Sequence, residues 1–145
     1  MDADLIFSTG GTMAMAGWLV LLASPLAPRL ADAVSTHAIP LLLSTAYAGL
    51  ILAYWTSGEG GFDSLDNVAR LFQTRELLLA GWLHYLAFDL FVGAWIVRTA
   101  RAEAIPYWMV APCLPATFLF GPVGYLAFGM IRFARSRVVQ PRLAA

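Results

Sequence analysis

The sequence predicts an all-α integral membrane protein, a four-helix bundle that forms a single domain over residues 1–145. Apolar residues make up 60% of the chain and charged residues only 12%, whereas soluble domains are about half apolar and about a quarter charged. Four stretches, at about 5–23, 38–55, 77–97 and 106–131, approach the roughly 20 mostly apolar residues that a spanning helix needs. These spans use most of the chain and leave no length for a soluble domain.

Small residues lie at helical spacing in the first two spans. Gly10, Ala14 and Gly17 share one stripe of the first span, and Ala46 and Gly49 share one stripe of the second. Small side chains let membrane helices approach closely. We therefore expect these two stripes to pack against each other.

A short amphipathic helix is expected between the second and third spans. Leu65, Val68, Ala69 and Phe72 recur at the i, i+3, i+4, i+7 spacing of one helical face, directly after Ser64, which can cap a helix. A helix with one apolar face at this place can lie on the membrane surface.

The fourth span contains Pro112, Pro115 and Pro122, and each of them removes a backbone hydrogen-bond donor. Within lipid, such breaks persist only where other groups satisfy the freed carbonyls. The sequence therefore predicts a kinked fourth helix whose irregular part faces the inside of the bundle. The arginine-rich tail at 132–145 is expected to lie in the cytoplasm, on anionic headgroups.

The distribution of arginine predicts the orientation in the membrane. All nine basic residues are arginine, a usage typical of a GC-rich bacterial genome, so the expected location is a bacterial inner membrane. With four spans, the two termini and the central loop share one side, and six arginines fall there against three on the other. Because cytoplasmic loops are rich in Lys and Arg, both termini are expected in the cytoplasm. Only the charges around the first span favour the reverse orientation, with Asp2 and Asp4 before it and Arg29 after it.

Asp89 in the third span is the main candidate functional residue. A carboxylate within hydrocarbon is costly unless it is neutralised, paired or hydrated, so such a residue indicates a functional site by default. At a rise of ~1.5 Å per residue, Asp89 lies at about the depth of Thr117 in the fourth span and Tyr47 in the second. Asp89 can take part in chemistry or can join helices through hydrogen bonds, and both interpretations stay open.

Two neighbours on the same helix bear on this choice. Tyr85 lies four residues before Asp89 and is the better hydrogen-bond partner, whereas His84 lies five residues before it, about 140° around the helix. His84 and Asp89 therefore do not form a ready-made pair on one face. Both could still contact a ligand that lies between helices, and His84 can equally be a donor that joins helices.

Other kinds of site are excluded by spacing. His37 and His84 enter their spans from opposite sides, so the two imidazoles cannot bind one haem iron. Cys and His do not cluster with zinc spacing, and we expect neither a metal nor a cofactor. Basic residues lie only at the flanks of the spans, so the expected partner is the lipid bilayer and not a nucleic acid.

Three runs of the sequence resemble a known family. They are Trp82–Gly93 (WLHYLAFDLFVG), Pro112–Leu114 (PCL) and Thr117–Gly124 (TFLFGPVG). Together they are similar to the abscisic-acid-deficient-four-like family, a group of four-span membrane proteins whose plant members are linked to neoxanthin synthesis. With Trp18 and Pro25 at the end of the first span and Leu65, Leu71 and Phe72 before the third, the resemblance covers nearly the whole chain. It implies a role in carotenoid metabolism.

The resemblance implies an isomerase that acts on a xanthophyll epoxide by acid/base chemistry within the membrane. Asp89 would protonate the epoxide oxygen, His84 would remove a proton from the neighbouring polyene carbon, and Tyr85 would orient Asp89. The residues expected to line the carotenoid are Tyr47, Trp82, Phe88, Thr117, Phe118 and Phe120.

Two other interpretations stay open beside the isomerase. The chain can be a non-catalytic membrane subunit that binds a carotenoid, a quinone or another isoprenoid lipid, as a homo-oligomer or within a membrane complex. It can also be a membrane scaffold, in which Asp89 only joins helices. Isomerised pigment would identify the enzyme, and purification within a larger complex would identify the subunit.

Overall fold

The computed structural model describes residues 2–139, and every regular element in that range is a helix. The helices are α1 (Ala3–Leu22), α2 (Pro28–Ala31), the π-helix η1 (Asp32–Ala38), α3 (Ile39–Tyr54), the short 3-10 helix η2 (Trp55–Ser57), α4 (Leu65–Leu71), α5 (Arg75–Ala102), α6 (Tyr107–Val110), α7 (Cys113–Phe120) and α8 (Pro122–Val139). The expected all-α fold is confirmed.

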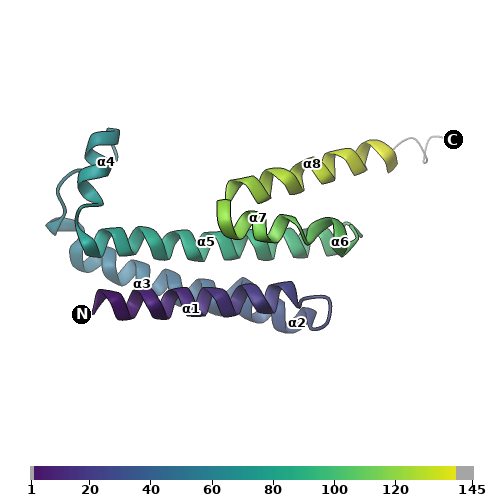
Figure 1. The fold of residues 1–145 in the computed structure, drawn as a ribbon, viewed down its shortest axis with the longest axis horizontal. Helices are drawn as coiled ribbons and strands as arrows, with labels where there is room; N and C mark the ends of the chain where they lie inside the picture. The colour runs from purple at the N-terminus through teal and green to yellow at the C-terminus, as the bar shows by residue number, and fades with distance from the viewer. Residues whose placement is uncertain (1, 140–145) are drawn as a thin grey trace.

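Three helical stretches are long and apolar enough to cross a membrane: α1, the continuous segment Pro28–Ser57 and α5. They lie along the long axis of the molecule (Figure 1), and α5, the longest at 28 residues, packs against both of the others. Leu83, Leu90 and Ile96 of α5 are almost fully buried and belong to the core. Several apolar helices of this length are typical of a membrane protein.

The small residues of α1 face α5 and not the small stripe of α3. A Cβ atom on Gly17 would lie 2.6 Å from Cδ2 of Leu90, and one on Gly10 would lie 2.7 Å from Cδ2 of Leu83. A Cβ atom on Gly49, by contrast, would meet nothing within 4 Å. The expected contact between the two small stripes is therefore wrong, because the glycines of α1 make room for large side chains of α5.

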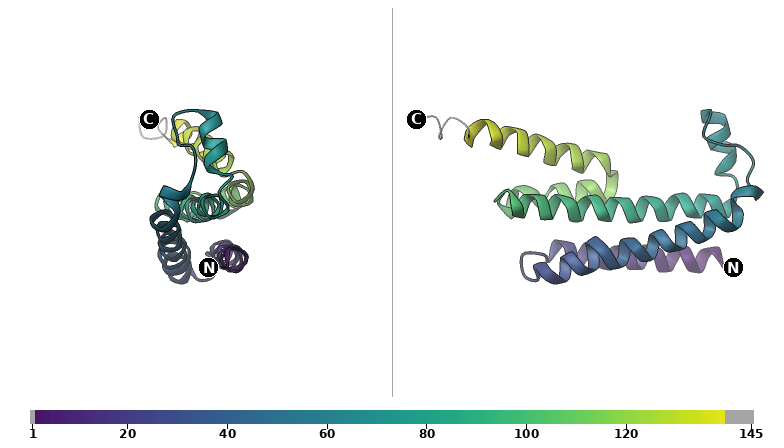
Figure 2. Two further views of the ribbon diagram at one scale, coloured as in Figure 1. Left: turned by 90° about the vertical axis from the view of Figure 1, so that its left-hand side faces the viewer. Right: turned by 180° about the vertical axis from the view of Figure 1, so that it is seen from behind.

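The segment expected to be a fourth span forms a hairpin and not one kinked helix. α6 and α7 run back along α5 from its end, the chain reverses at Gly121, and α8 returns beside α7 (Figures 1 and 2). The apolar stretch Tyr107–Phe120 rises only about 21 Å, less than the ~30 Å of a hydrocarbon core. Within the described residues, the fold is three long helices plus a helical hairpin that reaches about halfway along α5.

Gly121 and Pro122 explain the reversal. Gly121 has a φ of +43°, a left-handed conformation that glycine adopts at little cost. Pro122 has no N–H and cannot continue α7. Gly124 then lets α8 approach α7, because a Cβ there would lie 2.0 Å from Oγ1 and 2.4 Å from the backbone nitrogen of Thr117. The residues that predicted a kink therefore end one helix and start another.

Polar contacts fix the second half of α8 against the end of α5. The Arg132 guanidinium pairs with the Glu103 carboxylate, and Arg135 donates to the carbonyl of Ala104 at 3.4 Å. α8 therefore ends at the end of the bundle opposite to the start of α1 (Figure 1). The prediction that both termini share one side depended on a fourth crossing, whereas three of the described helical stretches are long and apolar enough to cross a membrane. The tail beyond residue 139 lies outside the described residues.

α4 is a short helix at the position expected between the second and third spans. Ser64 caps it by accepting a hydrogen bond from the Asn67 N–H at 3.2 Å. The helix extends crosswise from the end of the bundle where α1 begins (Figures 1 and 2). Leu71 is buried, whereas Leu65 and Phe62 are exposed. Exposed apolar side chains on a crosswise helix suit a position at the membrane surface.

Candidate functional site

A groove lies where α1, α5 and α7 meet, beside the tip of the hairpin. It has a volume of about 770 Å³ and a mainly apolar lining. The lining residues are Gly11, Ala14, Met15, Trp82, Tyr85, Leu86, Phe118 and Leu119. Three of the predicted site residues, Trp82, Tyr85 and Phe118, therefore lie in one groove, although they come from two separate helices.

Three aromatic side chains line this groove, and two further rings pack against them from outside its lining. The ring of Trp82 stacks on Tyr85 with centroids 5.4 Å apart, and the ring of Phe7 lies 5.5 Å from Trp82. Phe118 packs edge-on against Trp18 at 5.6 Å. Aromatic rings bury large apolar areas, so this wall can bind a long, flat, apolar ligand.

The Tyr85 hydroxyl joins α5 to the tip of the hairpin by donating a hydrogen bond to the carbonyl of Phe118 at 3.0 Å. The last carbonyls of a helix such as α7 have no partner within the helix, and inside a membrane there is no water to satisfy them. A hydroxyl has one proton to donate. The predicted donation from Tyr85 to Asp89 is therefore replaced by a bond that stabilises the hairpin.

Asp89 lies under the turn of the hairpin. A Cβ atom on Gly121 would lie 2.8 Å from Oδ1 of Asp89, so the missing side chain of Gly121 leaves the space that the carboxyl occupies. Oδ2 is buried and has no hydrogen-bond partner among the described residues. Asp89 is not part of the groove lining, but Tyr85 and Leu86, which lie one turn before it in α5, are. A carboxyl in this position is the most costly polar group of the site.

His84 lies on a different side of α5 from Asp89. Its ring stacks on Phe88 with centroids 4.5 Å apart and lies 5.7 Å from the ring of Tyr47 on α3. It lines a separate cavity of about 370 Å³ between α3, α4 and α5. His84 and Asp89 therefore do not line one cavity, in agreement with the angle of about 140° between them around the helix. Tyr47 and Phe88 lie with His84.

Thr117 and Phe120 do not reach the groove. Thr117 is buried, and its hydroxyl donates to the carbonyl of Cys113, one turn earlier in α7, at 2.8 Å. Phe120 is 63% exposed and is not among the lining residues. Both lie on the helix that forms one wall of the groove, but their side chains point elsewhere.

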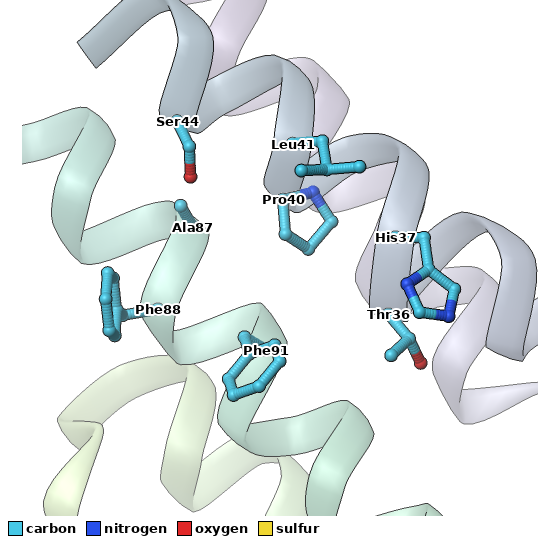
Figure 3. Close-up of a pocket in the computed structure, with 8 residues that line it drawn as sticks. All are labelled: Thr36, His37, Pro40, Leu41, Ser44, Ala87, Phe88 and Phe91. Carbon is cyan, nitrogen blue, oxygen red and sulfur yellow. The ribbon is translucent and has the colours of Figure 1, made fainter. Parts of the chain in front are cut away.

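Besides the groove and the cavity that His84 lines, another cavity lies between η1, α3 and α5 (Figure 3). The sequence did not predict it, and it is called the second cavity from here on. It has a volume of about 440 Å³ and is lined by Thr36, His37, Pro40, Leu41, Ser44, Ala87, Phe88 and Phe91. In the sequence, the signal for it is the polar run Ser35–His37 just before Pro40, within an otherwise apolar stretch. His37, which the sequence analysis used only to exclude a haem site, is thus part of a cavity.

A family model and a curated relative both relate the chain to one family. The sequence model of a family described as ABA DEFICIENT 4-like matches residues 5–128. A curated relative, "Protein ABA DEFICIENT 4, chloroplastic" from Arabidopsis thaliana, is 23% identical over 134 residues, which cover 86% of this chain. The chain spans 59% of the length of that relative. No solved structure matches the chain.

Proposed function

Since the chain belongs to the ABA DEFICIENT 4-like family, we propose that it is a membrane protein of carotenoid metabolism which binds a carotenoid or a related isoprenoid in the groove beside the hairpin and isomerises it. One observation carries the proposal: a groove of about 770 Å³ passes along Tyr85, one turn before Asp89, whose Oδ2 is buried and has no hydrogen-bond partner among the described residues. Ligand sites have volumes of about 300–1,000 Å³ and mostly apolar walls with few polar groups. The groove fits this description.

Asp89 can carry out the isomerisation alone if it acts first as an acid and then as a base. Its carboxyl gives a proton to the oxygen of a ring epoxide while a carbon–oxygen bond breaks. The resulting carboxylate then removes a proton from the neighbouring polyene carbon, which leaves an allenic alcohol and restores the acid. The step is redox-neutral, and it needs no contribution from His84, which lies on another side of α5.

Expression in carotenoid-producing bacteria that accumulate an epoxide-bearing xanthophyll tests the isomerase. We expect an isomerised pigment, of unchanged mass but new retention time, with the wild-type chain. Asp89→Asn should reduce its formation at least about 100-fold, because a positioned proton-transfer group contributes about 10²–10⁴-fold. Asp66→Asn, which changes an exposed carboxyl of α4 in the same way, is the matched control and should leave the product unchanged.

The alternative function is a non-catalytic subunit that binds the same class of ligand. It is favoured by one observation, that Asp89 is not in the groove lining. In that case the pigment profile stays unchanged with every variant, while pigment copurifies with the wild-type chain and is reduced by Trp82→Ala, which removes one wall of the groove. Full isomerase activity in Asp89→Asn would disprove the proposed chemistry and keep the binding role.

The hairpin also changes the orientation that we propose. The end of the bundle where α5 and α8 finish carries six of the arginines in the described residues, and the end where α1 begins carries two. The six are Arg29, Arg98, Arg101, Arg132, Arg135 and Arg137, and the two are Arg70 and Arg75. Arginine excess marks the cytoplasmic side. The start of α1 and α4 are therefore proposed to face away from the cytoplasm, which agrees with the local charges of the first span.

A further inference from the structure

The second cavity combines polar groups with two aromatic rings. Thr36 and His37 come from η1, Ser44 comes from α3 about two turns further on, and Phe88 and Phe91 approach from α5 (Figure 3). None of the lining residues is an aspartate, glutamate, lysine or arginine. The cavity therefore offers hydrogen bonds and ring contacts without a formal counter-charge for an ionic headgroup.

Thr36 carries a buried hydroxyl that lacks a partner. The residue is only 6% exposed, and its Oγ1 makes no hydrogen bond within the described part of the chain. Two other hydroxyls of the same segment are bonded: Ser35 donates to the carbonyl of Gly17 at 2.7 Å, and Thr45 to that of Leu41 at 2.8 Å. A buried hydroxyl without a partner has lost its hydration without compensation. A ligand oxygen would supply the missing bond once the Thr36 side chain turns its hydroxyl toward the cavity.

The geometry of η1 explains why Thr36 is left without a bond. A threonine in an α-helix commonly donates to the carbonyl four residues earlier, as Thr45 does in α3. Asp32–Ala38 is a π-helix, in which the backbone bonds follow the wider i→i+5 pattern. Short π-helical segments occur frequently at functional sites. The local geometry and the unpartnered hydroxyl therefore agree on a binding role for this segment.

We propose that this cavity binds the carbonyl-bearing ring of an isoprenoid quinone, at a site separate from the carotenoid groove. The quinone oxygens accept hydrogen bonds from the Thr36 and Ser44 hydroxyls or from the His37 imidazole, and the flat ring packs against Phe88 and Phe91. No lysine or arginine lines the cavity to pair with a phosphate headgroup. A volume of about 440 Å³ suits a ring with the start of its chain, and the rest of an isoprenoid tail lies in the lipid.

Binding is measured with the full chain in nanodiscs and decylubiquinone as the probe, with empty nanodiscs to correct for partition into lipid. We expect saturable binding, and a photoreactive azido analogue of the same quinone should label residues within 36–44 or 87–91. Thr36→Val, which replaces the hydroxyl by a methyl of similar shape, should weaken binding about tenfold, as loss of one hydrogen bond does. Its melting temperature should stay equal or rise, because no bond within the protein is lost.

Two controls separate this site from its surroundings and from the carotenoid groove. Thr45 lies on the same continuous helical segment as Thr36, but its hydroxyl already donates to the carbonyl of Leu41 and does not line the cavity. Thr45→Val should therefore leave quinone affinity unchanged. Asp89→Asn should also leave quinone affinity unchanged, so the experiments can contradict the quinone site and the carotenoid groove independently of each other. Wild-type affinity in Thr36→Val, labelling outside the two ranges, or the lack of saturable binding would overturn the proposal. Displacement of the probe by a ring-ketone carotenoid at lower concentration than by a second quinone would reassign the ligand and overturn it as well.

Discussion

Replacing Gly124 by alanine is expected to open the hairpin and to cause a large loss of stability. The added Cβ would lie 2.0 Å from Oγ1 and 2.4 Å from the backbone nitrogen of Thr117, and 2.5 Å from the carbonyl oxygen of Cys113. Two of these three atoms are backbone, so no side-chain rotation can relieve the overlap and α8 must move away from α7. Overpacking costs about 1–3 kcal/mol and occasionally more, and we expect the upper part of this range or beyond.

The measurement is the melting temperature of the purified chain in detergent, together with its yield as a single peak in size-exclusion chromatography. Gly129→Ala is the matched control, since it changes the same residue type in the same helix at a position where a Cβ meets nothing within 4 Å. That variant should be neutral or slightly stabilising, because alanine favours a helix over glycine by about 1 kcal/mol. Equal melting temperatures for the two variants would show that α7 and α8 are not packed at Gly124.

The loss of the hairpin contact should also reach the candidate site. Asp89 lies against Gly121, and Tyr85 donates to Phe118, so both residues of α5 depend on the position of the hairpin tip. A variant in which α8 moves away therefore changes the wall of the groove without any substitution in it. We expect Gly124→Ala to lose pigment binding along with stability, whereas Asp89→Asn should lose product formation with the fold retained.

Hydropathy predicted the long helices because a run of about 20 apolar residues has few other stable arrangements. It did not predict the hairpin, since Gly121 and Pro122 are equally compatible with a kink and with a reversal. The choice depends on the left-handed φ of Gly121 and on the approach of Gly124 to Thr117. These contacts join residues on two different helices, and the helical period of a single segment carries no information about them.

The candidate site was also predicted only in part: positions along one helix were predictable, and contacts between helices were not. The helical period placed Trp82, Tyr85 and Asp89 on neighbouring parts of one helix face and separated His84 from Asp89 by about 140°, and the structure keeps that separation. The partner of Tyr85 was not predictable, because the free carbonyl of Phe118 exists only where α7 ends. The second cavity was missed for a related reason: the unpartnered hydroxyl of Thr36 depends on the π-helical geometry of η1.

The hairpin in place of a fourth span reverses the orientation that we propose, and this reversal gives the second large prediction. In a background without the native thiol, Cys113→Ser, single cysteines are placed at Glu59, beside α4, and at Leu26, between α1 and α2. In intact bacterial cells, a membrane-impermeant maleimide should label Glu59→Cys almost fully and Leu26→Cys only after lysis. The reason is the excess of arginine at the Leu26 end of the bundle.

A fluorescent protein fused after the last residue completes the test, because a reporter of this kind can be chosen that fluoresces only in the cytoplasm. A half-depth hairpin places the end of α8 opposite to Glu59, whereas a fourth crossing places both on one side. A fluorescent tail with Glu59→Cys labelled from outside therefore supports both the hairpin and the proposed orientation. A dark tail with Glu59→Cys protected keeps the hairpin and reverses the orientation. A fluorescent tail with Glu59→Cys protected requires four crossings, and Asp89 would then no longer lie under a half-depth turn.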